Sequence, residues 1–320
     1  MRRPLPRATP AVALLSALAA GLIGGCSAGD TPDDPKSPGP GPATAGADAL
    51  GFTPRRLDLP VYDYQLSPAE HAEVATAKNL LVTSCMKRYG FSWSAPAPTV
   101  PRQDRRYGVI DRQAALRHGY HLLPTDSSAL GASGAAPASQ EEADALSGGQ
   151  LLDSDTGRSQ LAAGYREPVK RVRGKAVPPG GCAQEAEREL LGRDDLKSAA
   201  GVVSRINTGS FSESMTTGAV KKVFAAWSSC MDGAGYDFAD PLKSIGSADL
   251  STPTASAAEK KLAAADVTCK ESVDLVAVWS RAETAVQKRM IREEAAATTA
   301  QRADNAVRLR NAAAVIEKSG

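Results

Sequence analysis

The stretch SCMKRYGFSW at residues 84–93 recurs as SCMDGAGYDF at residues 229–238. In both copies a Cys-Met pair is followed, after three residues, by a glycine and an aromatic residue, with a second aromatic residue two positions later. A largely apolar run leads into each cysteine, and glycine is the residue that most easily adopts the left-handed conformation that closes a helix. The repeat therefore predicts two equivalent helix ends.

The composition favours a helical protein. Of the 320 residues 42% are hydrophobic and only 5% are aromatic. This balance suits helices that pack through small side chains better than an aromatic-rich sandwich of sheets, and a chain of this length can bury a sizeable core. We predict an all-α fold over residues 59–320, mainly helical with long irregular loops, and built from two pseudo-repeated halves at about 65–192 and 213–320.

The first residues have the pattern of an export signal. Basic residues precede an uncharged apolar run at Ala11–Ile23, and two glycines separate that run from Cys26. The run is shorter than the roughly 20 residues that a membrane-spanning helix needs. We predict a lipoprotein signal peptide over residues 1–25, cleaved before Cys26 and exported by the general or the twin-arginine route.

Residues Ile23–Cys26 resemble the lipobox of bacterial lipoproteins, and this resemblance implies that Cys26 carries the lipid and becomes the mature N-terminus. Residues 26–58 are rich in proline, glycine, alanine and serine, a composition that does not support a packed core. We therefore expect a disordered tether. Removing the three arginines of the signal peptide changes the formal charge from +2 to −1, so the charge gives no case for a nucleic-acid partner.

Four cysteines remain beyond Cys26, and an even number in an oxidising compartment predicts two disulfides. We favour Cys85–Cys182 and Cys230–Cys269, because each pair would join a cysteine that ends one helix to a cysteine near the start of a later helix in the same half. The pairing of Cys85 with Cys230 is the main alternative. Zinc binding is disfavoured because no two cysteines have the C-x-x-C spacing and no histidine lies close to them in sequence.

Local signals place several helices. Ser67-Pro68-Ala69-Glu70 is a capping box that predicts the start of the first one, and Asp111 is the expected N-cap of a short helix at 112–117. Further helices are expected within 127–149, at 183–191, and from Thr217 to Cys230, the last with a buried face that comprises Val220, Val223, Phe224 and Trp227.

The C-terminal segment from Thr254 to Ser319 contains neither glycine nor proline. It predicts one long amphipathic helix, or two helices that meet near Ala265-Asp266. The apolar stripe consists of Leu275, Trp279, Ala282, Val286 and Met290. Beyond Ile291 the stripe thins to alanine, so this part either packs back on the protein or projects as an arm that binds a partner.

The sequence contains no strong motif for a catalytic, metal-binding or anion-binding site. His118 and His121 flank Gly119, which indicates a surface turn more than a metal or catalytic pair. Residues 165–175 hold five cations against one carboxylate and would be attracted to an anionic wall polymer or phospholipid, or else form a solvated loop. Residues 84–87 match the S-x-x-K motif of penicillin-binding proteins, but the accompanying S-D-N and K-T-G motifs are absent. The sequence therefore predicts no catalytic residue, no metal and no cofactor.

The duplicated C-M-x-x-x-G-aromatic motif, the turn at Val177–Cys182 and the stretch Ala265–Lys270, all behind a lipobox, resemble uncharacterised secreted lipoproteins of actinobacteria. The resemblance implies a protein anchored by lipid at the outer face of the cell membrane. We expect a non-enzymatic binding or adaptor component that acts with a cell-wall polymer or a membrane transporter. A cell-wall enzyme and a solute-binding receptor are the alternatives.

Overall fold

The computed structural model of the chain describes residues 56–95, 97–98, 100, 103–123, 137–149 and 168–320. The chain divides into two units, Met1–Leu50 and Gly51–Gly320, and every described residue lies in the second. The predicted signal peptide, Cys26 and the predicted tether up to residue 55 lie outside the described residues.

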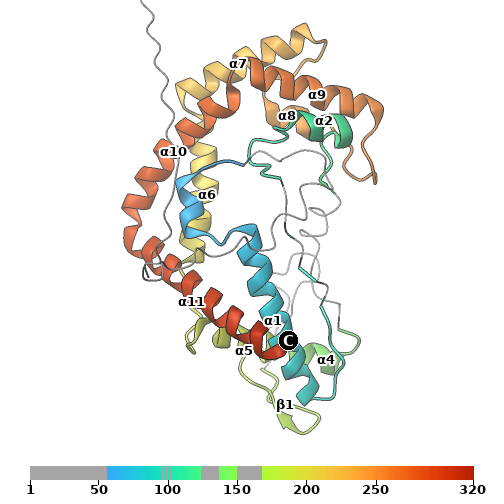
Figure 1. Cartoon of the computed structure of the whole chain (residues 1–320), viewed down its shortest axis with the longest axis vertical. Coiled ribbons are helices and arrows are strands. Elements are labelled where there is room, and N and C mark those ends of the chain that lie inside the picture. Colours follow the sequence, from blue (N-terminus) through green and yellow to red (C-terminus); the bar gives the residue numbers. More distant parts are fainter. Residues whose placement is uncertain (1–55, 96, 99, 101–102, 124–136, 150–167) are drawn as a thin grey trace, which may run out of the picture. The chain divides into compact units, whose positions relative to one another are not determined.

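The described residues are mainly helical, as the composition predicts (Figure 1). They form ten α-helices, one 3-10 helix and one two-stranded antiparallel hairpin. In chain order the elements are η1 (Pro60–Tyr64), α1 (Pro68–Arg88), α2 (Arg112–His118), α4 (Gln140–Ser147), β1 (Arg171–Val172), β2 (Lys175–Ala176), α5 (Gly181–Leu191), α6 (Ala200–Met215), α7 (Gly218–Gly233), α8 (Pro241–Gly246), α9 (Ala257–Ser272), α10 (Leu275–Glu293) and α11 (Ala295–Ser319).

Helix α1 begins where the capping box predicts. The Ser67 hydroxyl accepts a hydrogen bond from the Glu70 N–H at 3.3 Å, and the Glu70 carboxylate accepts one from the Ser67 N–H at 2.7 Å. These two bonds satisfy backbone donors that would otherwise lack partners at the start of a helix. Helices α2, α4, α5 and α7 likewise lie at predicted places, although Asp111 precedes α2 without a side-chain capping bond.

The first copy of the repeat ends α1 with a Schellman motif. The Phe91 N–H donates to the Met86 carbonyl at 3.2 Å, and the Gly90 N–H donates to the Lys87 carbonyl at 3.0 Å. Gly90 has a φ of 79°, the left-handed conformation that this motif requires. Met86 and Phe91 are buried in the same hydrophobic cluster, which is the apolar contact that accompanies such helix ends.

The second copy ends α7 in the same way. The Tyr236 N–H donates to the Met231 carbonyl and the Gly235 N–H donates to the Asp232 carbonyl, each at 2.9 Å. Gly235 has a φ of 87°, and Met231 and Tyr236 share a hydrophobic cluster. The predicted equivalence of the two helix ends is confirmed.

Two hydrophobic clusters surround the two repeat copies. The first lies between α1, α4, α5 and the hairpin, and it includes Cys85, Cys182 and Trp93. The second lies between α7, α9 and α10, and its buried members are Tyr107, Ile110, Val220, Val223, Trp227, Met231, Cys269, Leu275 and Trp279. The predicted buried face of α7 is confirmed, with Phe224 partly buried at its edge.

The C-terminal segment forms three helices, so both alternatives for it were wrong. The chain breaks at Asp274, which has a φ of 53°, and again at Glu294, rather than near Ala265-Asp266. Aspartate tolerates the left-handed conformation better than most residues other than glycine. A helix can therefore end there without the glycine or proline by which a break is usually recognised.

Helix α11 and residues 104–123 each pack against the other predicted half, so the two halves are not separate. Helix α11 packs back against α1 and α5 (Figure 1), where Ala312 shares a buried cluster with Ala77 and Leu190. From the first predicted half, α2 packs against α9 of the second half, and Tyr107 is buried in the second hydrophobic cluster. The two predicted halves thus exchange segments. Helix α6, which packs against α10, was not predicted.

Candidate functional site

The disulfides have the pairing that the sequence favours. Cys85 is joined to Cys182 and Cys230 to Cys269, each with a Cα–Cα distance of 5.6 Å, a normal separation for this bond. Cys182 lies in the first turn of α5 as expected. Cys269 instead lies in the last turn of α9, because the break in the chain falls after it, at Asp274.

Glu185 lies beside the first disulfide, with a carboxylate oxygen 3.1 Å from Cys85 Sγ, and it forms an ion pair with Arg88. Three potential metal-ligand atoms therefore meet at this point. Metal binding by cysteine requires thiolates, and both sulfurs here belong to the Cys85–Cys182 disulfide. In the oxidised protein this cluster is a staple between α1 and α5.

The described part of the basic run closes the C-terminal end of α1. Arg173 donates to the Tyr89 carbonyl at 3.1 Å, and Lys175 donates to the Arg88 carbonyl. Cations are favourable at this end of a helix, where the last carbonyls lack helical partners. The first residues of the run, 165–167, lie outside the described residues.

His121 is held by a carboxylate and a backbone carbonyl. Its Nδ1 is 2.9 Å from the Glu259 carboxylate and its Nε2 is 2.9 Å from the Thr252 carbonyl. The hydrogen bond with Glu259 raises the pKa of His121, whereas burial lowers the pKa of His118. No described residue is a hydrogen-bond partner of both rings, so the two histidines do not form a common site within the described part.

Glu283 is a fully buried carboxylate on α10. It accepts hydrogen bonds from the Arg106 guanidinium, from the Tyr107 hydroxyl at 2.7 Å and from the Ser210 hydroxyl at 2.9 Å. Burial raises the pKa of Tyr107, so this phenol stays protonated as a donor. A buried charge with this many partners joins α6 and α10 to residues 106–107, and it is interpreted as structural.

Asp266 and Lys270 form a second buried pair, one helical turn apart on α9, with a separation of 2.8 Å. Asp266 also accepts from the Trp227 indole N–H at 3.0 Å, and Lys270 donates to the Val109 carbonyl at 2.9 Å. Burial raises the pKa of Asp266 and lowers that of Lys270. The pair connects α9 to α7 and to the segment before α2.

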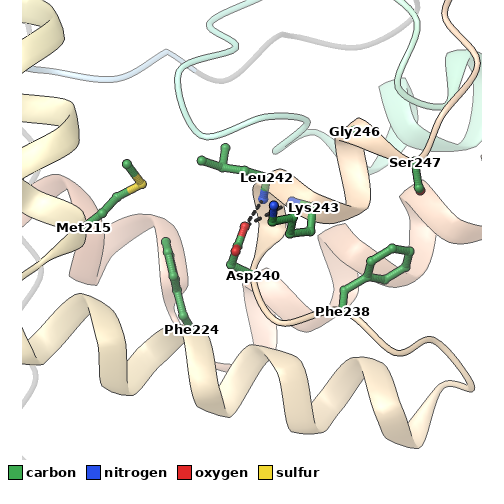
Figure 2. A pocket seen from close by; sticks show the side chains of 8 residues that line it. All are labelled: Met215, Phe224, Phe238, Asp240, Leu242, Lys243, Gly246 and Ser247. Atoms are coloured by element: carbon green, nitrogen blue, oxygen red, sulfur yellow. Dashed lines mark hydrogen bonds between the residues drawn. The ribbon is translucent and has the colours of Figure 1, made fainter.

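An open apolar hollow of about 860 Å³ lies where α6, α7 and α8 meet (Figure 2). Its apolar lining side chains are all half-buried: Met215, Phe224, Phe238 and Leu242. Phe238 is the second aromatic residue of the repeated motif, and the Ser228 hydroxyl donates to its carbonyl at 2.7 Å. The hollow is thus built on the C-terminal end of α7.

Two charged residues border this hollow and have different roles. The Asp240 carboxylate accepts hydrogen bonds from the Leu242 and Lys243 N–H groups, at 2.9 and 3.1 Å, and thereby starts α8 (Figure 2). The Lys243 ammonium is exposed and has no hydrogen-bond or ion-pair partner among the described residues. A positive charge is therefore available at the edge of an apolar surface.

A second pocket, the polar pocket, of about 630 Å³, lies between η1, the start of α1, Pro98 and residues 103–105. Its polar side chains are Arg56, Tyr62, Gln65, Ser67, His71, Gln103, Asp104 and Arg105. Asp104 fixes one wall, because its carboxylate accepts from the Tyr62 hydroxyl at 3.1 Å and from the N–H groups of Leu57 and Arg106 at 3.2 and 3.1 Å.

Neither pocket was recognised from the sequence. Residues 215, 224 and 238–247 contribute to the apolar hollow, and residues 56–75, 98 and 103–105 contribute to the polar pocket. Each pocket is formed by residues that are far apart in the sequence, and no local sequence pattern links them. Two sequence features could have pointed to the apolar hollow. Phe238 in the second repeat is half-buried, and Asp240-Pro241 is a helix start. Cys26, the predicted lipidation site, lies outside the described residues.

No family model, no curated protein and no solved structure is significantly similar to this chain. Within the described part, no helix combines the length and the apolar character needed to cross a membrane. Two disulfides are typical of an extracytoplasmic protein.

Proposed function

We propose that this protein is a lipid-anchored component of the cell envelope, held at the outer face of the membrane through Cys26. It acts as a non-enzymatic binding or adaptor component. The observation that carries the binding role is the apolar hollow at α6, α7 and α8, where four half-buried apolar side chains remain open to a partner. The two disulfides and the lipobox-like residues 23–26 support the location.

The hollow fits a segment of an envelope protein or membrane transporter that presents an apolar side chain next to a carboxylate. Phe224 and Phe238 supply aromatic surface of the kind that dominates binding energy at interfaces. Lys243 supplies the complementary charge, because its exposed ammonium has no described partner, whereas the Asp240 carboxylate faces the backbone N–H groups that start α8. An anionic wall polymer is a second partner class, for which Lys170 and Arg171 offer exposed cations.

The two buried carboxylates, Glu283 and Asp266, have structural partners and are not candidates for catalysis. Glu283 and Asp266 each accept several hydrogen bonds from side chains within the fold. A general acid or base must instead reach a proton on the substrate. Neither of these two carboxylates lines the apolar hollow or the polar pocket.

Reversing the charge of Lys243 tests this proposal. In crosslinked envelopes, the parent chain should recover one membrane or envelope protein in stoichiometric amount. We expect Lys243→Glu to reduce that recovery about tenfold, because a carboxylate at the edge of the hollow would repel the acidic residue of the partner. Quantitative mass spectrometry of the crosslinked material measures this change.

Lys288→Glu is the matched control, because Lys288 is an exposed lysine on α10 that has no described partner and lies outside the hollow. It should leave the recovery unchanged. If both variants recover the partner as well as the parent chain does, the hollow is not the binding surface. If only wall fragments are recovered, the adaptor role is wrong.

A further inference from the structure

We infer that the pocket between η1, the start of α1, Pro98 and residues 103–105 binds a small sugar that carries a carboxylate or a phosphate group. Its volume of about 630 Å³ lies within the range of small-ligand sites. It shares no lining residue with the apolar hollow. The inference adds a small-molecule site to the function proposed above and does not depend on the partner that the hollow binds.

Three polar side chains line this pocket without a described partner. Arg56 and His71 are exposed and Gln65 is half-buried, and none of the three makes a side-chain hydrogen bond or ion pair within the described part of the chain. They come from three successive pieces of chain: the segment before η1, the residue after η1 and the second turn of α1. These groups are open to solvent, so a polar ligand in the pocket could bind them in place of water without breaking contacts of the fold.

The charge of the pocket favours an anion. Arg56 is a guanidinium without a described partner, and guanidinium groups bind carboxylates and phosphates through two parallel hydrogen bonds. The lining carries two guanidinium groups, Arg56 and Arg105, against one carboxylate, Asp104. Asp104 accepts three hydrogen bonds, and the Glu70 carboxylate accepts the Ser67 N–H in the capping box.

The remaining lining favours a ligand rich in hydroxyl groups rather than a bare anion. The Gln65 amide can both donate and accept, as hydroxyl groups require. Burial lowers the pKa of His71, so its ring is neutral near pH 7 and offers one donor and one acceptor. Between these groups lie the apolar surfaces of Leu66, Ala72 and Pro98, which suit the C–H faces of a sugar ring.

Calorimetric titration of the purified full chain with four probes tests this inference. Glucose 6-phosphate and glucuronate represent the two sources of negative charge. Glucose tests the need for the charge, and inorganic phosphate tests the need for the sugar. We expect at least one of the charged sugars to bind about tenfold or more tightly than either glucose or inorganic phosphate.

Substitution of Arg56 tests whether this pocket is the site. Arg56→Gln should weaken binding of the charged sugar about tenfold or more, and Gln65→Ala should weaken it through loss of hydrogen bonds to hydroxyl groups. Both positions lie outside the hydrophobic clusters, so the fold should persist. Arg292→Gln, an exposed arginine outside the pocket, should have no effect.

A preference for glucuronate identifies a carboxylate-bearing sugar as the ligand, and a preference for glucose 6-phosphate identifies a phosphorylated one. Either result supports the inference. It is overturned if no probe binds at up to about 10 mM, if glucose or inorganic phosphate binds equally well, or if Arg56→Gln binds as the parent chain does. These failures would leave the crosslinking test of the apolar hollow unaffected.

Discussion

At the scale of single residues, His121 is a point at which the stability of the fold responds to pH. Its pKa is raised by the hydrogen bond with Glu259, so the protonated ring stabilises the folded state. This contribution is fully present below the unfolded pKa of about 6.5 and is lost as the pH rises through the higher folded value. His71 and His118, whose pKa values are lowered by burial, act in the opposite direction.

We therefore expect His121→Gln to destabilise the protein more at about pH 5.5 than at about pH 8.5. Urea denaturation of the variant and the parent chain at both pH values measures the difference. The comparison isolates His121, because the other two histidines are common to both proteins. An equal loss at the two pH values would show that the His121–Glu259 contact contributes no charge-dependent stability.

At the scale of single elements, the end of α7 offers a matched test of the repeated motif. Gly233 and Gly235 both lie in open space, where an added Cβ would meet nothing within 4 Å, but only Gly235 has a positive φ, of 87°. Gly235→Ala should cost roughly 1–2 kcal/mol of unfolding free energy, because the left-handed conformation disfavours a Cβ. Gly233→Ala should instead stabilise by roughly 0.5–1 kcal/mol, because alanine is a better helix former than glycine.

Thermal or urea unfolding of the two variants decides the point. Opposite signs at two positions that are two residues apart would exclude a general effect of replacing glycine. If Gly235→Ala were as stable as the parent chain, the left-handed helix end would not be the feature that the repeat preserves.

The elements also show which structural signals the sequence carries. The capping box at Ser67–Glu70 and the glycines at 90 and 235 are local, so they could be recognised. The break at Asp274 has no such signal, because an aspartate in the left-handed conformation looks like any other helix residue in the sequence. The two pockets depend on tertiary packing, and no spacing along the chain indicates that Arg56 lies near Asp104.

At the scale of the whole described unit, the two predicted halves exchange segments, and the sequence does not indicate this exchange. The alanine-rich α11 buries Ala312 against Ala77 of α1 and Leu190 of α5. The spacing of alanines in the sequence does not show which helix such a small-residue contact will face.

The disulfides span 97 and 39 residues. In the chain-entropy model they contribute about 4 to 5 and about 4 kcal/mol, as upper estimates.

The most direct test of the account is mass spectrometry of the mature protein isolated from membranes and digested without reduction. We predict an N-terminal peptide that begins at a diacylated Cys26, together with one linked peptide for Cys85–Cys182 and one for Cys230–Cys269. An unmodified peptide that continues through Cys26 would contradict the lipid anchor. A peptide that links Cys85 to Cys230, or four free thiols, would contradict the two stapled helix ends on which the fold is built.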